Sequence, residues 1–367
     1  MNYDARKPLM AKIESLRNRR TLVCFMNFDR LCDPQLPGLS TNFDAQAKEA
    51  LFRVLKESPT HGGVDFYVYT RGGDLNSVWP IVSLTREFDR NFNVLVPFRC
   101  HSSGTLLALG AEKIVMGSLS ELSPIDPTTG NQFNPIDPGA PGSGRRLGIS
   151  VEDVRAYRKF VIESLLGDPE GQPDPGLLLQ FVQKLIDQVH PLALGNVERV
   201  LLQIEQLAAN LLKLQPHRDR DHKHVVNALT SKFYSHLHMI NRHEAKEILG
   251  KRVAFAPQRL ADAMDALLRA YEMKFQLRRT FFLKKFLAER PEAEVRFIGG
   301  VLESRHWSYL YETKAVIRQR TKLPPNVQVQ IPAGQALPLM AGLPRELEID
   351  VLEQGWVRNE APLGVTV

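Results

Sequence analysis

Residues 99–117 read RCHSSGTLLALGAEKIVMG and join a strand-like run to a helix-like run through two serines and a glycine. The residues before this turn, FNVLVPF, are apolar and partly β-branched, whereas GTLLALGA is rich in residues that favour a helix. A strand followed at once by a helix is the repeating unit of parallel α/β folds. The stretch therefore predicts an α/β fold with small hydroxyl residues where a strand turns into a helix.

The same alternation runs upstream and downstream of this turn. Strands are expected at RTLVCFMNF (20–28), VDFYVYT (64–70) and KIVMG (113–117), and helices at FDAQAKEALFRVLKES (43–58) and LNSVWPIVSLTREF (75–88), where Pro80 can kink or shift the helix. Strands that alternate with helices pair in parallel through right-handed crossovers. Residues 20 to about 140 are therefore expected to form a βαβ core.

The remainder of the chain differs from this core in composition. Residues 128–148, TTGNQFNPIDPGAPGSGRRLG, are dense in Pro, Gly and Asn and predict a loop or lid. Residues 150–290 have helical periodicity and begin with Ser150 as an N-cap, and 324–367 suggest short strands or an extended tail. We expect three units: a core with the reactive turns (1–148), a mainly helical extension (149–323) and an extended C-terminal segment (324–367).

Composition excludes several classes of protein. The chain has 367 residues, 43% hydrophobic and 24% charged, and no apolar run long enough for a membrane span. The N-terminus lacks the pattern of a secretory signal, and three cysteines without zinc spacing predict reduced thiols, so we expect a cytoplasmic protein without metal or cofactor. The net charge of +6 comes from basic residues interleaved with acids, which favours solvated helix faces over nucleic-acid binding.

Two strand-to-helix turns carry the chemistry. In YTRGGDLNS (69–77), paired glycines let backbone N–H groups approach a ligand closely. In the second turn, Ser102 or Ser103 stands at a helix start, where free N–H groups favour developing negative charge. Together the turns could supply a nucleophile and an oxyanion hole, as acyl transfer requires. Taken alone, the first turn also fits a common glycine turn and the second an ordinary serine N-cap, and this structural interpretation is favoured until other knowledge is added.

The order of these motifs resembles a known superfamily. TRGGD, then RCHSSGTLLALGAEKIVMG, then SELSPIDPTTG is similar to the Clp and crotonase superfamily, and within it to the signal peptide peptidase A class. Three later blocks, VHPLALGNVERVLLQIEQLAANLL, SHLHMINRHEAKEILGKRV and VLESRHWSYLYETKAVIRQR, resemble the serine dehydrogenase proteinase family, a branch of that class without a membrane anchor. The resemblance spans residues 20 to about 320 and implies a Clp/crotonase-like core with an extended, mainly helical C-terminal region.

The resemblance implies roles for individual residues. Ser102 falls on the nucleophile of the Ser-x-Gly pattern, because the glycine two places on is Gly104. The amide of Ser103, with that of Gly73 or Gly72, would form the oxyanion hole. The chain departs from the pattern in RCHS, where relatives have small residues. The neighbouring His101 is expected to point to the opposite face of the strand from Ser102.

The general base is the open position of this pattern. No histidine stands where the Clp protease subunit has one, and signal peptide peptidases use a lysine, which acts as a base only when burial lowers its pKa. Arginines such as Arg145 and Arg146 stay protonated, and Lys113 is expected at an exposed strand start. Lys159, between bulky neighbours in the helix after the loop, is therefore predicted as the base.

Two alternatives remain at the base: a plain surface lysine at position 159, and His101 in its place. Asp126 is left between orienting a base and capping its own turn. A base supplied by a second copy of the chain is a further option.

The resemblance thus implies a serine peptidase that hydrolyses peptide bonds with Ser102 and a Ser-Lys dyad. It also implies self-association into homo-oligomers and a peptide or protein as substrate. A catalytically silent Clp-fold scaffold is the alternative. A crotonase-type acyl-thioester enzyme fits less well, because such an enzyme needs no serine at position 102 and usually offers carboxylates.

Overall fold

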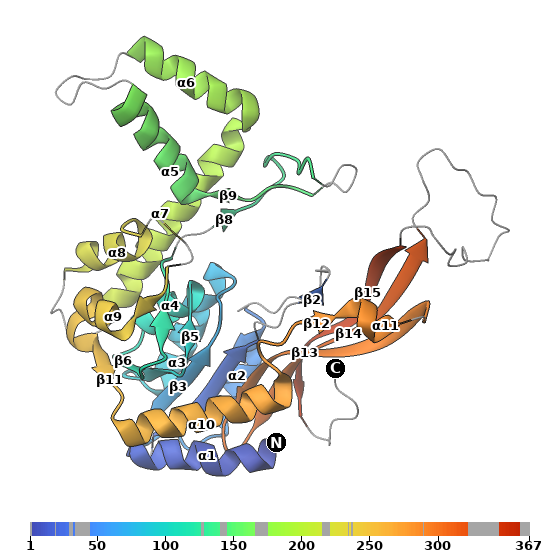
Figure 1. Cartoon of the computed structure of the whole chain (residues 1–367). Helices are drawn as coiled ribbons and strands as arrows, with labels where there is room; N and C mark the ends of the chain where they lie inside the picture. Colours follow the sequence, from blue (N-terminus) through green and yellow to red (C-terminus); the bar gives the residue numbers. More distant parts are fainter. Residues whose placement is uncertain are drawn as a thin grey trace.

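Eight strands form the central sheet, in the order β11-β6-β4-β3-β1-β13-β14-β15 (Figure 1). The structure is a computed structural model that describes residues 2–18, 20–28, 32–33, 45–125, 128–139, 145–165, 175–214, 221–233, 235, 238–288, 290–321 and 345–359. The strands of the sheet are β1 (Thr21–Asn27), β3 (Val64–Tyr69), β4 (Asn93–Val96), β6 (Lys113–Met116), β11 (Val253–Phe255), β13 (Glu292–Glu303), β14 (Ser308–Thr321) and β15 (Arg345–Arg358).

The first half of this sheet is parallel. β1 pairs with β3, β3 with β4, β4 with β6 and β6 with β11, all in parallel. The predicted α/β fold is therefore confirmed, and the four strands expected within residues 20–117 are present. The run 92–100 is interrupted after Val96, since Pro97 has no N–H to donate to a ladder. Its last two residues form β5 (Arg99–Cys100), which belongs to a separate three-stranded sheet with β7 (Glu121–Leu122) and β10 (Ile240–Asn241).

Helices cover both faces of the parallel strands. They are needed because successive side chains of β1 point to opposite faces of the sheet and all are buried. Val23 and Phe25 join the larger apolar cluster with α2 (Ala47–Lys56), α3 (Val78–Phe88) and α4 (Ser103–Leu109). Leu22 and Met26 join a second cluster with α1 (Tyr3–Leu16) and α10 (Gln258–Phe275) on the opposite face. Pro80 lies in the first turn of α3, where its missing N–H breaks no helical hydrogen bond, so it does not kink the helix.

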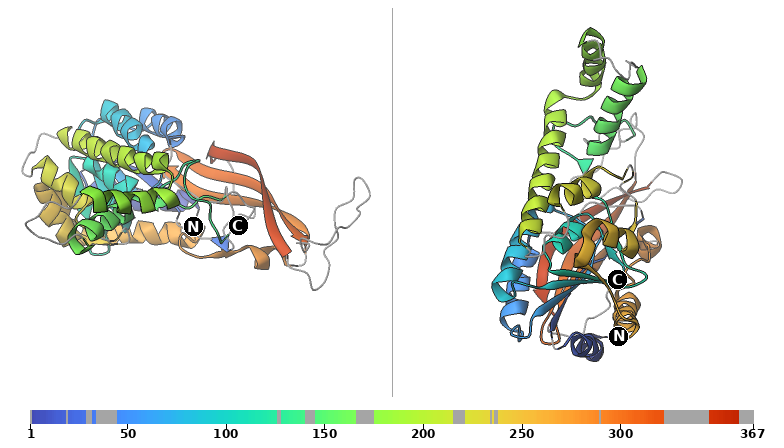
Figure 2. Two further views of the ribbon diagram at one scale, coloured as in Figure 1. Left: turned by 90° about the horizontal axis from the view of Figure 1, so that it is seen from above. Right: turned by 90° about the vertical axis from the view of Figure 1, so that its left-hand side faces the viewer.

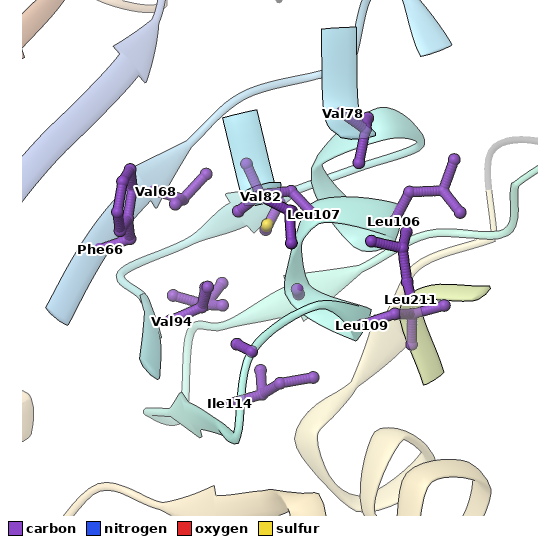
Figure 3. Close-up of a cluster of buried hydrophobic side chains, with 14 of the residues drawn as sticks. Phe66, Val68, Val78, Val82, Val94, Leu106, Leu107, Leu109, Ile114 and Leu211 are labelled. Carbon is purple, nitrogen blue, oxygen red and sulfur yellow. The ribbon is translucent and has the colours of Figure 1, made fainter. Parts of the chain in front are cut away.

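The short helix α4 is buried on all sides. All seven of its residues are buried, and Figure 3 shows Leu106, Leu107 and Leu109 among the side chains of Val82, Ile114 and Leu211. A helix so enclosed is fixed by packing rather than by its own propensity. The turn that precedes it is therefore anchored to the core.

A buried ion pair ties the N-terminal helix to the sheet. Arg6 Nη2 lies 2.6 Å from Glu303 Oε1, and both side chains are almost fully buried. Tyr271 of α10 donates to the other carboxylate oxygen at 2.8 Å. Three segments far apart in sequence thus meet at one carboxylate, whose charge is compensated where water is absent.

A helical arm projects from this body (Figure 1; right-hand view of Figure 2). It consists of α5 (Val151–Lys159), a π-helical turn (Phe160–Leu165), α6 (Pro175–Gln188) and the first half of α7 (Pro191–Lys213). The second half of α7 packs on the core through Ile204, Ala208 and Leu211. A small apolar cluster, which includes Val151, Val197 and Leu201, joins α5 to α7, together with an ion pair between Arg155 and Glu205 at 3.6 Å.

The region after the arm differs from the expected helical extension. Residues 292–321 form β13 and β14, and residues 345–358 form β15, all antiparallel and continuous with the core sheet through β1 (Figure 1). The alternation of the buried Thr313, Ala315 and Ile317 with less buried neighbours is a strand pattern that the helical interpretation of 149–323 did not include. The division of the chain into three units stays a prediction.

The remaining elements are short. They are β2 (Cys32–Asp33), β8 (Thr128–Thr129), β9 (Ile149–Ser150), β12 (Phe281–Phe282), α8 (His222–Thr230), α9 (Arg242–Leu249), α11 (Leu283–Leu287) and two 3-10 turns (Leu75–Ser77, Gly250–Arg252).

Candidate active site

The two predicted turns lie side by side at the carboxyl ends of parallel strands. Thr70, at the end of β3, bridges to Cys100: Thr70 N–H donates to Arg99 O at 2.9 Å, and His101 N–H donates to Thr70 O at 3.1 Å. These bonds fix the glycine turn after β3 against the serine turn after β5. The site thus forms at the sheet edge where parallel α/β folds place their ligands.

Gly72 touches Ser102 directly. Its φ is 110°, and a Cβ built on it would lie 2.8 Å from Ser102 Cβ and 3.3 Å from Ser102 Oγ. Both the backbone angle and the contact require glycine. The N–H of Gly72 donates to Thr70 Oγ1 at 3.0 Å, so this amide already has an acceptor.

Ser102 has a backbone conformation that non-glycine residues rarely adopt, with φ 49° and ψ −112°. The buried Ser123 holds it: Ser102 N–H donates to Ser123 Oγ at 2.8 Å, and that hydroxyl donates to Pro124 O at 2.9 Å. Strain at a turn persists only where the surroundings fix it. Within the described residues, the Oγ of Ser102 has no hydrogen-bond partner.

The residues after Ser102 close the turn onto the core. Gly104 is required by packing, because a Cβ there would lie 2.6 Å from Thr70 Cγ2. Ser103 is fully buried and its hydroxyl has no partner in the described part of the chain. The Ser103 N–H, at the first position of α4, likewise has no acceptor among the residues described, as expected for a first-turn amide. The Gly104 N–H, in contrast, donates to His101 O at 2.8 Å.

His101 is engaged away from this turn. Its Nε2 lies 3.1 Å from Glu121 Oε1, the same oxygen that Arg99 Nε contacts at 3.2 Å. A histidine paired with a carboxylate is chemically suited to proton transfer. Here the pair lies beside the nucleophile turn, not hydrogen-bonded to Ser102.

Lys159 is the last residue of α5, in the projecting arm. Its side chain is 57% exposed, and its Nζ lies 3.9 Å from Glu163 Oε2. Figure 1 places α5 beyond β8 and β9, with its C-terminal end directed away from α4. Within one chain, therefore, the structure brings Gly72, Gly73, Ser102 and Ser103 together but leaves Lys159 apart.

The other basic residues named in the sequence analysis do not lie at the turn of Ser102. Lys113 Nζ donates to Lys251 O at 3.0 Å at the start of β6. Arg145 pairs with Asp137, and Arg146 donates to Asn134 O at 2.6 Å. Asp126 lies outside the described residues.

The loop predicted at 128–148 contains ordered hydrogen bonds where it is described. β8 pairs with β9, and the buried Asn134 donates to Thr129 O at 2.9 Å and Leu147 O at 2.8 Å. Phe133 stacks on His190, the N-cap of α7, with ring centroids 4.8 Å apart. The described part of the loop is thereby attached to the base of the arm, and its role as a lid stays a prediction.

The sequence of the site region matches a known family. Residues 2–136 match the family described as ClpP-like SDH-type serine proteinases. The predicted resemblance is thus confirmed for the stretch that contains both reactive turns, and the family supports a serine peptidase in general terms.

Three further comparisons accompany this match. Two uncharacterized proteins of Methanocaldococcus jannaschii are similar to the chain, one 32% identical over 82 residues (22% of this chain, 29% of the relative) and one 25% identical over 132 residues (35% and 45%). A mutant of a membrane-bound stomatin-specific protease aligns with 59% of this chain and 75% of its own, at 11% identity and a TM-score of 0.35. The chain spans less than half the length of both curated relatives.

The ClpP-like stretch contains the nucleophile turn but not the predicted base. Ser102, Gly72 and Gly73 lie within residues 2–136, whereas Lys159 and the arm lie beyond them. In the described part of the chain, no helix is long and apolar enough to cross a bilayer, and no three His, Cys, Asp or Glu side chains gather as metal ligands.

Sequence reasoning missed the residues that hold the ClpP-like turns in place. Ser123 supports the Ser102 amide, and Thr70 connects the two turns through its backbone and supports the glycine turn through its hydroxyl. Thr70 is the last residue of a predicted strand, and Ser123 lies in the block SELSPIDP, so the available signal was a hydroxyl residue near each turn. No spacing rule distinguishes such hydroxyls from ordinary turn residues.

Proposed function

We propose that the protein is a serine peptidase in which Ser102 attacks the carbonyl carbon of a peptide bond. The contact between Gly72 and Ser102 is the observation that supports this assignment most strongly. It sets a hydroxyl with no partner in the described chain against a turn of backbone amides. Acyl transfer needs a nucleophile and an oxyanion site in this relation.

The amides of Gly73 and Ser103 are the proposed oxyanion hole. Gly72 donates to Thr70 Oγ1 and Gly104 donates to His101 O, so the amides next to them in the two turns are the donors assigned to the substrate. Gly72 then shapes the turn rather than binding the oxyanion. Fixed amides stabilise the tetrahedral intermediate without reorganising during the reaction.

The proposed reaction follows the order of acyl transfer. Ser102 Oγ bonds to the carbonyl carbon while its proton passes to the base, and the oxyanion forms between the two amides. The base returns the proton to the departing amine as the C–N bond breaks, which leaves an ester on Ser102. Water, deprotonated by the same base, then hydrolyses this ester.

We assign the base to Lys159 of a second copy of the chain. Lys159 is half-exposed on a projecting arm, and a lysine base needs burial. Phe160, Leu179 and Leu192 of the arm are more than half exposed, at 53%, 58% and 56%, so the arm has apolar surface to bury against a neighbour. A homo-oligomer with a Ser-Lys dyad of the signal peptide peptidase A class is part of the proposal.

The cellular location in this proposal is the cytoplasm. Cys24 and Cys100 are free and buried, which suits a reducing compartment. Peptides or proteins of that compartment are the proposed substrates.

A catalytically silent scaffold is the second candidate, favoured because no base is hydrogen-bonded to Ser102 Oγ in the described chain. Peptide hydrolysis by purified Ser102→Ala, compared with the native chain, separates the two. We expect activity to fall by about 10³-fold or more, with the circular dichroism spectrum unchanged. Ser118→Ala, at an exposed serine nearby, is the matched control and should keep full activity. A native chain that cleaves no peptide in a broad library would favour the scaffold.

A further inference from the structure

Residues 276–290, QLRRTFFLKKFLAER, contain five basic residues and one acidic residue. We refer to this stretch as the cationic segment. It connects α10 to β13 and includes β12 and α11 (Figure 1). The acidic residue, Glu289, lies outside the described residues.

The cationic segment has a buried side and an exposed side. Leu277, Leu283 and Leu287 are fully buried and Phe281 nearly so, which fixes the segment against the body. The opposite side exposes all five cations together with Phe282, which is 44% exposed. The Lys285 ammonium lies 4.8 Å from the Phe282 ring centroid.

Most basic side chains of the cationic segment lack the carboxylate partners that basic side chains of the strand β14 have. On β14, Lys314 pairs with Glu353, Arg318 with Glu292 and Asp350, and Arg320 with Glu348. In the cationic segment, Arg278 is the only basic side chain with a carboxylate partner among the described residues, Glu272 at 3.2 Å. A surface with unpaired charge of one sign attracts ligands of the opposite sign.

A continuous chain of contacts leads from this surface to the nucleophile turn. The Arg278 guanidinium carbon lies 5.5 Å from the Phe98 ring centroid, and that of Arg99 lies 4.4 Å from the same centroid. Arg99 then contacts Glu121, and Glu121 contacts His101, the residue before Ser102. The cationic segment is thus linked by successive contacts to the residue before Ser102, through the largely buried Phe98 and Glu121.

We propose that the cationic segment is a docking surface for the acidic part of a peptide substrate whose scissile bond lies at Ser102. The inference rests on the proposed peptidase function and names its substrate class. An anionic membrane or a nucleic acid would also be attracted by charge alone. The contact chain to His101 favours a peptide, because an extended peptide rises about 3.3 Å per residue and can place one part at a basic segment and another at a separate reactive turn.

Binding of labelled peptides to the full-length Ser102→Ala variant tests the proposal without hydrolysis. The probes are a fluorescein-labelled peptide with a run of glutamates and the same peptide with glutamines, measured by fluorescence anisotropy at low and physiological salt. We expect the glutamate peptide to bind more tightly, and the difference to shrink as salt screens the charges. The double charge reversal Arg279→Glu/Lys284→Glu should weaken its binding by about tenfold or more.

The matched control is Lys184→Glu/Lys223→Glu, which changes net charge equally on α6 and α8, elements that Figure 1 places away from α11. It should leave binding unchanged. Equal binding of both peptides, or equal loss in both double variants, would overturn the inference. So would a preference for vesicles of anionic lipid or for an oligonucleotide over the acidic peptide. Absence of hydrolysis in the native chain, with selective binding intact, would instead count against the peptidase.

Discussion

The turn at Ser102 and the arm that carries Lys159 are built in opposite ways. The three residues after Ser102 are buried, its amide is held by Ser123, and Gly72 lies against its side chain. On the arm, the Lys159 side chain is 57% exposed, and a small apolar cluster joins α5 to α7. The proposed nucleophile is thus preorganised within one chain, whereas the proposed base is presented to the surroundings. Under the proposed mechanism, a complete site then requires two copies.

Among substitutions on the arm, Lys159→Met should lower the rate of peptide hydrolysis the most. Loss of a general base lowers the rate by about 10²–10⁴-fold. Because the base is proposed to act on a neighbouring chain, mixing inactive Lys159→Met with inactive Ser102→Ala should restore part of the activity. Hydrolysis of a fluorogenic peptide by the mixture measures this directly.

Lys184→Met, on α6 of the same arm, is the control and should stay active. Full activity of Lys159→Met would remove the lysine from the mechanism and turn attention to His101 with Glu121. An inactive mixture of two folded variants would argue against a base supplied by a second copy.

Gly72→Ala tests the contact between the glycine turn and Ser102 in the core. The new Cβ would press on Ser102 at 2.8 Å in a backbone conformation with φ 110°, so both turns must shift. We expect a loss of about 10²–10³-fold in kcat, the cost of a misplaced oxyanion site. Gly130→Ala, where no atom lies within 4 Å of the added Cβ, should be neutral. Near-native kcat in Gly72→Ala would show that the contact is not needed.

Ser123→Ala should have a smaller effect. It removes the acceptor of the Ser102 N–H and the donor to Pro124 O, and it leaves Ser102 in place. A buried N–H left without its acceptor costs about 1–3 kcal/mol. We expect kcat to fall by about tenfold with KM little changed, measured by steady-state kinetics. A change in KM alone would assign Ser123 to substrate binding.

The smallest expected effect is on the free energy of unfolding at alkaline pH. Burial raises the pKa of the Cys100 thiol above its ordinary value near 9.0. The unfolded thiol ionises above that value while the folded one stays protonated, so its contribution to stability is present at lower pH and lost as pH rises. Urea unfolding between pH 8 and 10.5 should therefore show falling stability, with a shallower fall in Cys100→Ala. The difference in slope is at most about 1.4 kcal/mol per pH unit. Identical slopes would contradict the buried neutral thiol.

The sequence predicted the core well and the periphery poorly, for physical reasons. Strands such as β1 and β3 are buried on both faces and read as continuous apolar runs, which the helices between them identify as parallel. β13 and β14 lie in the range 149–323 that was predicted to be mainly helical, whereas β15 lies in the segment for which short strands or an extended tail were expected. Their partners are set by contacts between segments far apart in sequence, such as Arg6 with Glu303.

The same division holds for the site. The motifs located Gly72 and Ser102, because glycine and serine at strand ends are local signals. The Glu121 partner of His101 lies in β7 and Ser123 directly follows that strand, and local pattern gives no measure of such distances. The separation of Lys159 from Ser102 follows from the direction in which the arm projects, which depends on tertiary packing.

The central claim is that Ser102 is an activated nucleophile. Incubation of the native chain with a fluorophosphonate probe, followed by peptide mass analysis, tests it most directly, because the probe phosphonylates an activated serine without needing a known substrate. We predict a single adduct on Ser102, absent from Ser102→Ala and weakened in Gly72→Ala. An adduct on another serine, or no adduct in a folded oligomeric sample, would contradict the account.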